Sequence, residues 1–276
     1  MSSIKKAYRD FLNTHEGANV YRQFKRLLYA RNDSLVQWLN PSVFQTLPAV
    51  RGLKVRVCDI GGGDGDRITR ILQFLQSRFG NRFHLDFIEQ SALYVSEFDP
   101  APLSQFCRTK VHHKLFEETE LSAKSYHLVL LIHSIFAFEN GNSTEKVLAL
   151  RRDGGSIVVV SNASKSFLGG LKRLTDYGYE DRRFEIDDLE RTLRKLQIPY
   201  QRRTTQTEWA IERKTWRQDM SVILDWISLG RFKSFPTSKC KEIESYIYKR
   251  GRERNSKTFF KEEEVVLVIP SVGRGH

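Results

Sequence analysis

The sequence predicts an α/β fold with a mostly parallel, seven-stranded sheet and helices on both faces of the sheet. Two observations lead to this prediction. From residue 54 onward, short apolar segments of strand length alternate with amphipathic segments of helical spacing. A glycine-rich segment at residues 61–65 lies between the first of these strands and the helix that follows. Strands separated by helices of this length form a parallel sheet that is covered on both faces.

The length of 276 residues fits one large domain or two small ones. We expect residues 1–50 to form a helical N-terminal cover. Apolar and aromatic side chains recur there at helical spacing between residues 8 and 12 and again between residues 21 and 28. A break with N-cap residues at 32–34 predicts a further helix at residues 34–44.

Residues 51–276 are expected to form the main domain, with a helical insertion at about residues 208–257 before the last strand. Strands are expected at residues 55–60, 83–89, 109–113, 126–133, 156–161, 199–207 and 264–269. Helices are expected at residues 64–79, from 91, near 144–150, at 167–174 and at 186–196. The first of these helices should end near Gly80, because glycine readily takes the left-handed conformation found at helix C-termini.

Composition excludes several classes of protein. Hydrophobic residues make up 40% of the chain and charged residues 28%, as in ordinary globular proteins, which excludes a disordered, collagen-like or coiled-coil chain. No apolar run reaches the length of a membrane span, and the N-terminus has no signal-peptide pattern. The three cysteines form no C-x-x-C pair, so we expect reduced thiols, no metal site and a cytoplasmic protein.

The segment from Asp59 to Gly65, with the sequence DIGGGDG, gives the sharpest local signal. It does not fit the dinucleotide fingerprint G-x-G-x-x-G/A, because Asp66 occupies the last position. Asp64 and Asp66 also place negative charge where a pyrophosphate would bind. The glycines either allow a ligand to approach the backbone closely or only form a structural turn.

The pattern D-x-G-x-G-x-G, with an acid at the end of the next strand, resembles the first motif of class I S-adenosylmethionine-dependent methyltransferases. The resemblance implies a Rossmann-like fold, S-adenosylmethionine as cofactor and S-adenosylhomocysteine as product. It implies a cofactor site whose residues are Asp59, Gly61, Gly62, Gly63, Gly65 and Glu89. Glu89 would accept hydrogen bonds from the ribose hydroxyls; the alternative is an exposed strand end. The sulfonium and ammonium groups of this cofactor would be attracted to nearby acids.

A closer resemblance, to the histamine N-methyltransferase family, extends thinly along nearly the whole chain. It rests on residues 7–13, on IGGG at 60–63, on IEQSA at 88–92, on LIHSIF at 131–136 and on the segment before the last strand. It implies that Gln90, Ile132 and His133 contact the cofactor. It also implies that the N-terminal cover forms part of a substrate pocket, with the substrate-binding candidates Tyr8, Glu16, Phe136, Phe167 and Glu262.

Departures from that family indicate a remodelled pocket. His133 replaces the family's glutamine, Phe167 and Leu171 replace two tryptophans, and Glu262 stands at its asparagine. We therefore expect methyl transfer to a small molecule, at a nitrogen of an amine or imidazole-type compound, without support for histamine itself. A small-molecule O-methyltransferase is one alternative.

Several candidate residues have a second interpretation. His133 is either the catalytic group that accepts a proton or a histidine satisfied by backbone or water. Glu262 begins the run EEE at 262–264, so it either binds substrate or lies in a solvated turn. Tyr8, Phe136 and Phe167 are either walls of the pocket or ordinary core residues.

The net charge of +12 leaves a nucleic-acid methyltransferase as the other alternative. Basic residues cluster at 151–152, 182–183, 202–203 and 249–254. However, neither the D/N-P-P-Y/F motif of enzymes that methylate base amines nor a Pro-Cys nucleophile is present. A nucleic-acid partner is therefore not favoured, and the basic residues could simply form a solvated surface.

Overall fold

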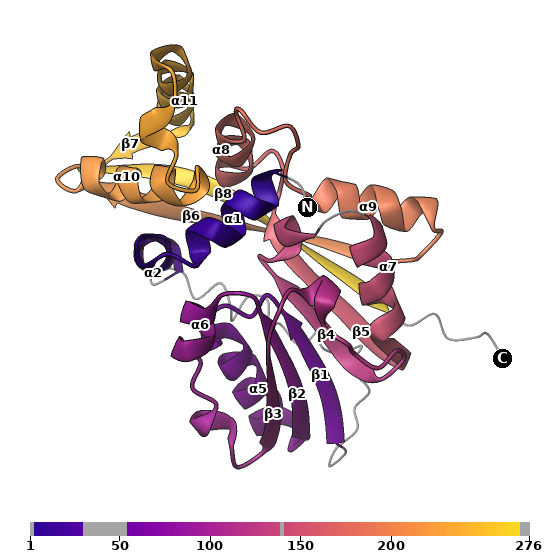
Figure 1. The fold of residues 1–276 in the computed structure, drawn as a ribbon. Helices are drawn as coiled ribbons and strands as arrows, with labels where there is room; N and C mark the ends of the chain where they lie inside the picture. Colours follow the sequence, from indigo (N-terminus) through magenta and orange to yellow (C-terminus); the bar gives the residue numbers. More distant parts are fainter. Residues whose placement is uncertain (1–2, 30–53, 139–140, 271–276) are drawn as a thin grey trace. The chain divides into compact units, whose positions relative to one another are not determined.

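The computed structural model describes residues 3–29, 54–138 and 141–270, so the helix expected at 34–44 lies outside the described residues. The chain divides into two compact units. Unit 1 comprises Met1–Ser34, Asn162–Arg183 and Thr204–Glu264, and unit 2 comprises Leu35–Ser161, Phe184–Arg203 and Val265–His276. Figure 1 shows the elements of both units.

Unit 2 is built on parallel strands, as the sequence predicts. The strands are β1 (Lys54–Ile60), β2 (Arg82–Glu89), β3 (Cys107–His113), β4 (Tyr126–Ile132) and β5 (Arg151–Asn162). Their order is β3-β2-β1-β4-β5, and each neighbouring pair is parallel. The order continues with β8 (Lys257–Pro270) and β6 (Gln201–Glu212), two strands that contribute residues to both units.

The described sheet has eight strands rather than the expected seven. The additional strand is β7 (Arg252–Arg254), which pairs antiparallel with the beginning of β8. A three-residue polar strand has no apolar pattern by which the sequence could reveal it.

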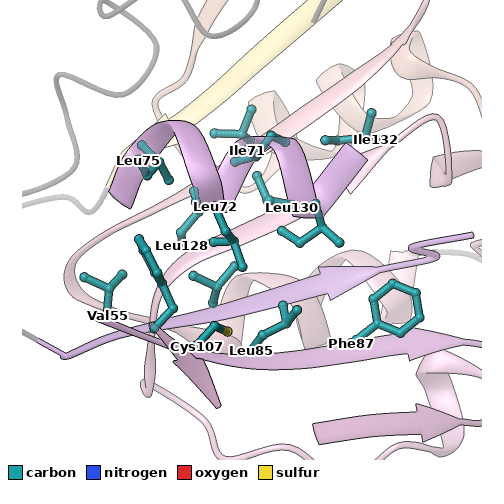
Figure 2. Packing of buried hydrophobic residues seen from close by; sticks show 14 of the residues in the cluster. Val55, Ile71, Leu72, Leu75, Leu85, Phe87, Cys107, Leu128, Leu130 and Ile132 are labelled. Carbon is teal, nitrogen blue, oxygen red and sulfur yellow. The ribbon is translucent and has the colours of Figure 1, made fainter. Parts of the chain in front are cut away.

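Among the described residues of unit 2, the helices are α5 (Asp66–Phe79), α6 (Ala92–Glu97), α7 (Gly141–Leu150) and α9 (Ile186–Lys195), with short 3-10 turns η1 (Ala101–Leu103), η2 (Phe116–Glu118) and η3 (Ile135–Ala137). Apolar side chains of β1, β2 and β4 pack against α5 to form the core (Figure 2). Val57, Leu85 and Leu130 contribute from the strands, and Ile71 and Leu72 from the helix; all are at most 3% exposed.

Glycines determine where α5 begins and ends. Gly65 before the helix and Gly80 after it both have the left-handed conformation. The Gly80 N–H donates to the carbonyl of Gln76, which closes the last turn. The prediction that this helix ends near Gly80 is confirmed.

Unit 1 contains the helices α1 (Ser3–Leu12), α2 (His15–Tyr29), α8 (Phe167–Thr175), α10 (Trp216–Ile227) and α11 (Thr237–Arg250), and the 3-10 turn η4 (Phe232–Ser234). Trp226 of α10 is at its aromatic centre. Its ring lies 4.5 Å from Tyr21, 5.6 Å from Phe24, 5.9 Å from Tyr8 and 6.4 Å from Phe11, measured between centroids. Trp226, 7% exposed, is therefore a core residue of unit 1.

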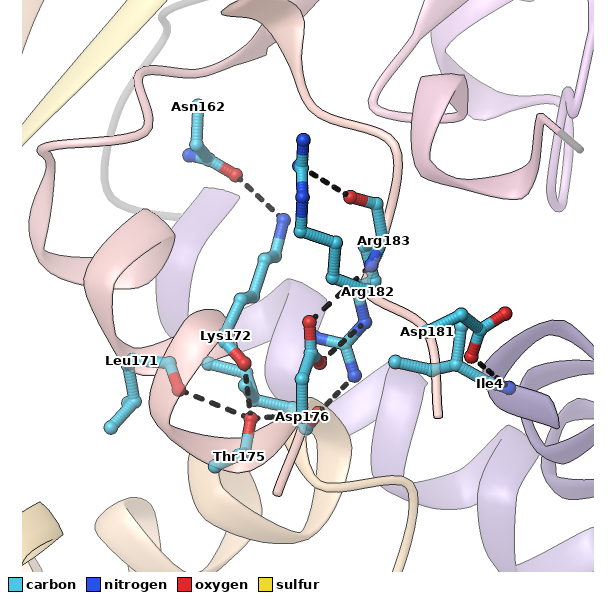
Figure 3. Close-up of polar contacts among 10 residues, drawn as sticks. Ile4, Asn162, Leu171, Lys172, Thr175, Asp176, Asp181, Arg182 and Arg183 are labelled. Atoms are coloured by element: carbon cyan, nitrogen blue, oxygen red, sulfur yellow. Dashed lines mark hydrogen bonds and ion pairs between the residues drawn. The ribbon is translucent and has the colours of Figure 1, made fainter. Parts of the chain in front are cut away.

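Polar contacts hold the segment after α8 (Figure 3). The buried Arg183 forms an ion pair with Asp176 at 3.4 Å and donates to the carbonyl of Ile227 at 2.6 Å. The backbone N–H of Ile4 donates to the carboxylate of Asp181 at 3.1 Å. One of the basic clusters in the sequence thus contributes to the interior of unit 1.

Two sequence predictions in the second half are wrong. The helical insertion expected from residue 208 begins only at Trp216, because β6 continues to Glu212. Trp209 and Ile211 are buried while the residues between and beside them are not, which is the alternation of a strand. The last strand begins at Lys257 instead of residue 264, so the solvated turn considered for Glu262 is also wrong.

None of the helices in the described ranges combines the length and the apolarity of a membrane-spanning segment.

Candidate functional site

The carboxyl ends of β1 and β2 meet at the glycine loop, residues 61–65. The N–H groups of Gly61 and Gly62 both donate to the carbonyl of Ile88, at 2.8 and 3.1 Å. Gly61, Gly63 and Gly65 have φ values of 71°, 63° and 76°. These values lie in the left-handed region, which favours glycine. The loop thus turns sharply after β1 and leads directly into α5.

Packing explains the absence of side chains at three of these glycines. A Cβ at Gly61 would lie 2.5 Å from the Cβ of Ser134, and one at Gly65 would lie 2.1 Å from the ring of Phe98. A Cβ at Gly62 would lie 2.1 Å from the ring of Phe87. The glycines are therefore required by the protein's own packing as well as by the shape of the loop.

Glu89 ends β2 and is only 5% exposed, so the alternative of an exposed strand end is wrong. One carboxylate oxygen accepts a hydrogen bond from the N–H of Gly63 at 2.9 Å, and the other accepts from the N–H of Ser91 at 2.8 Å. Burial raises the pKa of Glu89, although these backbone donors oppose the shift. A carboxylate offers about four acceptor positions, so Glu89 retains capacity for further donors.

Asp59 lies at the end of β1 and is 4% exposed. Burial, together with the nearby charge of Glu89, raises the pKa of Asp59 to about 7, although the charge of Arg67 opposes the shift. Two buried acids side by side are costly in their charged forms, and a cationic ligand would reduce that cost. The electrostatics of this loop therefore suit a positively charged ligand better than a phosphate.

The end of β4 approaches the same loop. The hydroxyl of Ser134 donates to the carbonyl of Ile60 at 2.6 Å, which joins the ends of β4 and β1. His133 precedes it with a φ of 55°, an uncommon conformation for a residue with a side chain. Its N–H donates to the carbonyl of Val160 at 2.8 Å, and its side chain is half-buried.

The other predicted cofactor residues lie near these strand ends. Ile132 is the last residue of β4, and the half-buried Gln90 follows β2. The backbone carbonyl of Gln90 accepts a hydrogen bond from the His113 side chain at 3.1 Å. All nine predicted cofactor residues thus belong to unit 2, at the carboxyl ends of β1, β2 and β4, where open α/β sheets bind ligands.

The predicted substrate residues are divided between the units. Phe136 belongs to unit 2 and is half-buried in η3. In unit 1, Tyr8 is half-buried against Trp226, and Glu16 is exposed in the first turn of α2.

Phe167 and Glu262 lie inside unit 1. The ring of Phe167, 1% exposed, packs 4.3 Å from that of Phe260 and 5.6 Å from that of Trp209, between centroids. The Glu262 carboxylate accepts from the Leu168 N–H and the Asn162 side chain, both at 3.0 Å. Burial raises the pKa of Glu262 to about 7. Both side chains therefore contact the protein itself.

Ser134 and Phe98 were not among the predicted site residues. Ser134 packs on Gly61, while Phe98 packs on Gly65 and stacks on Phe87 at 4.1 Å between centroids. Ser134 directly follows His133 in the sequence, so its position was a usable signal. Phe98 gave none, because nothing in the sequence relates it to the loop. In the described part of the chain, no group of three or more His, Cys, Asp or Glu residues is arranged to hold a metal ion.

Comparisons with known proteins agree on the fold. No protein-family profile and no curated protein matches the chain. Solved structures do match. A candidate methyltransferase of Bacillus halodurans has a TM-score of 0.53 at 14% identity, with 84% of this chain and 97% of that chain covered.

Two further solved structures match in the same way. The YcgJ protein of Bacillus subtilis also has a TM-score of 0.53 at 14% identity, over 84% of this chain and 99% of that one. A candidate sarcosine dimethylglycine methyltransferase of Galdieria sulphuraria has a TM-score of 0.51 at 13% identity, over 85% and 84%. The chain thus has the Rossmann-like fold of class I methyltransferases; at these identities the likeness concerns the fold alone.

Proposed function

We propose that the protein is an S-adenosylmethionine-dependent methyltransferase that acts on a small molecule, at a nitrogen of an amine or imidazole-type compound. The observation that carries the proposal is the buried acid pair, Asp59 and Glu89, beside the glycine loop. It favours a cationic cofactor over a dinucleotide. The fold supports the same choice, since its similar structures include candidate methyltransferases.

The residues of unit 2 fit this cofactor. Glu89 would accept hydrogen bonds from the ribose hydroxyls with the acceptor positions that Gly63 and Ser91 leave open. Asp59 would face the positively charged methionine portion, directly or through water. Gln90 and Ile132, next to the strand ends, would border the cofactor. When bound, S-adenosylmethionine supplies a methyl group activated by its sulfonium and is released as S-adenosylhomocysteine.

His133 is the proposed catalytic residue. An amine attacks only as the neutral form with its lone pair free, so a neutral imidazole can accept the proton that the nucleophile loses. Its strained backbone at the end of β4 supports this role, because such conformations cluster at functional sites.

Tyr8, Glu16 and Phe136 remain the proposed contacts for the acceptor. Tyr8 and Phe136 are half-buried and Glu16 is exposed, so none of the three side chains is fully enclosed by its own unit. Phe167 and Glu262 are proposed to shape unit 1 through the contacts described above. We also propose that the chain belongs to the histamine N-methyltransferase family and has a remodelled pocket. A cytoplasmic location is part of the same proposal.

Calorimetry with S-adenosylmethionine tests the cofactor, and no binding would remove the proposal. Labelled S-adenosylmethionine with a panel of amines, imidazoles, phenols and RNA then identifies the acceptor; transfer to phenols or RNA alone would favour the alternatives named from the sequence. His133→Asn tests the catalytic role. Asparagine tolerates the left-handed backbone and so keeps the end of β4 in place; turnover should fall about 10²–10⁴-fold, far more than cofactor affinity does. Unchanged turnover would reduce His133 to a structural role.

A further inference from the structure

One face of the β1–β3 sheet is strongly basic. Val55 and Val57 of β1, with Phe83 and Leu85 of β2, point to the core against α5. Because side chains alternate along a strand, the residues between them point to the opposite face. Six of the basic residues on that opposite face make up what we call the basic sheet face: Lys54, Arg56, Arg82, His84, Arg108 and Lys110.

Strand register arranges these residues in rows. Arg56, His84 and Arg108 lie side by side across the three strands, and Lys54 lies beside Arg82. Neighbouring positions in such a grid are about 4.8 Å apart across strands and about 6.6 Å apart along them. Lys54, Arg82, Arg108 and Lys110 are exposed, whereas Arg56 and His84 are half-buried. The four exposed positive groups therefore reach solvent on one face of the sheet.

The one acid on this face of β1–β3, Asp86, offsets only part of the positive charge: it pairs with Arg56 and lies beside Lys110 in the strand register. Asp86 accepts hydrogen bonds from His112 at 2.8 Å and Tyr126 at 2.9 Å, and Arg56 lies 3.5 Å away. Burial alone would raise the pKa of Asp86, but these three partners hold it below its ordinary value. Asp86 is thus already fully engaged.

The positive charge continues toward β4 and β5. The Nδ1 atom of His127 accepts a hydrogen bond from the backbone N–H of Arg56 at 3.0 Å. The other ring nitrogen, Nε2, lies 2.8 Å from the guanidinium of Arg152. Burial and the charges of Arg152 and Arg56 lower the pKa of His127. Burial is the largest cause of this shift, and the charges of the two arginines add to it.

We infer that the basic sheet face binds the phosphate backbone of a nucleic-acid strand. Single charges spread over a flat grid match a series of phosphates, whereas one small anion would need charges converging on a point. Attachment to a lipid surface normally adds apolar side chains that insert between lipids, and the six residues include none. Binding here lies beyond the proposed methyl transfer, because the glycine loop follows the carboxyl end of β1, whereas these residues lie in the first halves of their strands, with Lys110 at the middle of β3.

The test is fluorescence anisotropy with a short, labelled, mixed-sequence single-stranded RNA, over a series of salt concentrations. The variant Arg82→Glu/Arg108→Glu/Lys110→Glu removes exposed charges from the basic sheet face. A matched control makes the same change of net charge at exposed positions in unit 1: Arg217→Glu/Lys241→Glu/Lys249→Glu. Thermal unfolding of each variant checks folding, and Arg108→Glu/Lys110→Glu replaces the triple variant if that one does not fold.

The wild type should bind the RNA with an affinity that falls with salt. The variant of the basic sheet face should bind the RNA at least tenfold more weakly than the control variant. The slope of its log affinity against log salt should also become shallower, by about 0.7 for each phosphate that the variant no longer neutralises. Equal weakening in both variants, greater weakening in the control, or no binding by the wild type at low salt would overturn the inference. So would binding to vesicles containing phosphatidylserine without binding to RNA. S-adenosylmethionine affinity, measured in parallel, should be the same in all variants, so failure of the proposed cofactor is seen separately.

Discussion

At Gly61 two separate effects exclude a side chain, and Gly80 allows them to be distinguished. Both glycines have left-handed backbones, with φ values of 71° and 67°. A Cβ at Gly61 would lie 2.5 Å from Ser134, whereas a Cβ at Gly80 would have nothing within 4 Å. Alanine at Gly80 therefore meets only backbone strain, and alanine at Gly61 meets backbone strain and a clash.

We expect Gly80→Ala to lower the free energy of unfolding by about 1–2 kcal/mol, the cost of a left-handed alanine. Gly61→Ala should cost about 1–3 kcal/mol more, because an overpacked site is added. Urea unfolding of both variants measures the difference. The double variant Gly61→Ala/Ser134→Gly removes the Cβ that clashes and should recover part of the stability; equal costs at the two glycines would show that the Ser134 side chain is unimportant.

Glu262 should make stability depend on pH. Its pKa is about 7 in the folded protein, and its ordinary value is 4.5. Between these values the folded protein binds more protons than the unfolded chain, so the free energy of unfolding falls as the pH rises from 4.5 to about 7. The full effect is on the order of 3 kcal/mol. Asp59, whose pKa is also raised to about 7, acts in the same direction.

Glu262→Gln should remove the contribution of Glu262 and leave that of Asp59, so about half of their combined fall should remain, because glutamine keeps an acceptor oxygen but does not ionise. The measurement compares the free energy of unfolding at about pH 5 with that at about pH 7.5, because these two values lie on either side of most of the Glu262 titration. Glu263→Gln is the control, since Glu263 is less buried than its neighbour. If Glu262→Gln showed the same pH dependence as the wild type, the buried carboxyl would not titrate in this range.

At the level of elements, prediction succeeded where a buried face repeats and failed where it does not. Helix α5 and strands β1, β2 and β4 have apolar residues at regular spacing, and glycines mark both ends of the helix. In the second half of β6 the only apolar residues are Trp209, Ala210 and Ile211, which follow one another, so the sequence shows no clear alternation and resembles the start of a helical segment. The helix and strand periods are hard to separate over so few residues.

The candidate site likewise contains residues that the sequence could predict and contacts that it could not. The loop glycines and Glu89 follow from strand order and a local motif, both of which sequence reveals. The burial of Glu262 depends on Asn162 and on Leu168, which lie about a hundred residues away in the chain. Contacts over such separations leave no local pattern.

Helix α9 provides a prediction at this scale. Its first turn has a capping box, in which the Asp188 carboxylate accepts from the Glu185 N–H at 2.9 Å. Asp188 also pairs with Arg191 at 2.8 Å. Asp188→Ala should lower the free energy of unfolding by about 0.5–2 kcal/mol. The exposed Asp187 in the same turn is the matched control, and Asp187→Ala should cost less; a reversed order would show that the box does not stabilise the helix.

In the whole molecule, several of the basic residues that give the net charge of +12 form contacts within the fold. Arg183 lies buried in its ion pair with Asp176, and Arg151 donates to the carbonyls of Ile269 and Pro270. Arg202 lies 3.5 Å from Glu190. The basic pairs that stand out in the sequence are thus partly engaged within the fold, whereas the basic sheet face consists of residues scattered in sequence and gathered by strand register.

Binding of the cofactor should also be visible in the stability of the whole protein. A ligand that binds only the folded state at about a hundred times its Kd stabilises it by about 2.7 kcal/mol, which raises the Tm by roughly 5–10 °C for a chain of this size. We expect S-adenosylmethionine to produce this shift and NAD, with its pyrophosphate, to produce none, because Asp59 and Glu89 place two buried acids at the loop. Glu89→Gln should abolish the shift, since its amide would turn a donor toward the N–H of Gly63 or Ser91. Glu120, which is exposed, supplies the control, and Glu120→Gln should retain the full shift in Tm. If NAD raised the Tm as much as S-adenosylmethionine does, the electrostatic argument for the choice of cofactor would be wrong.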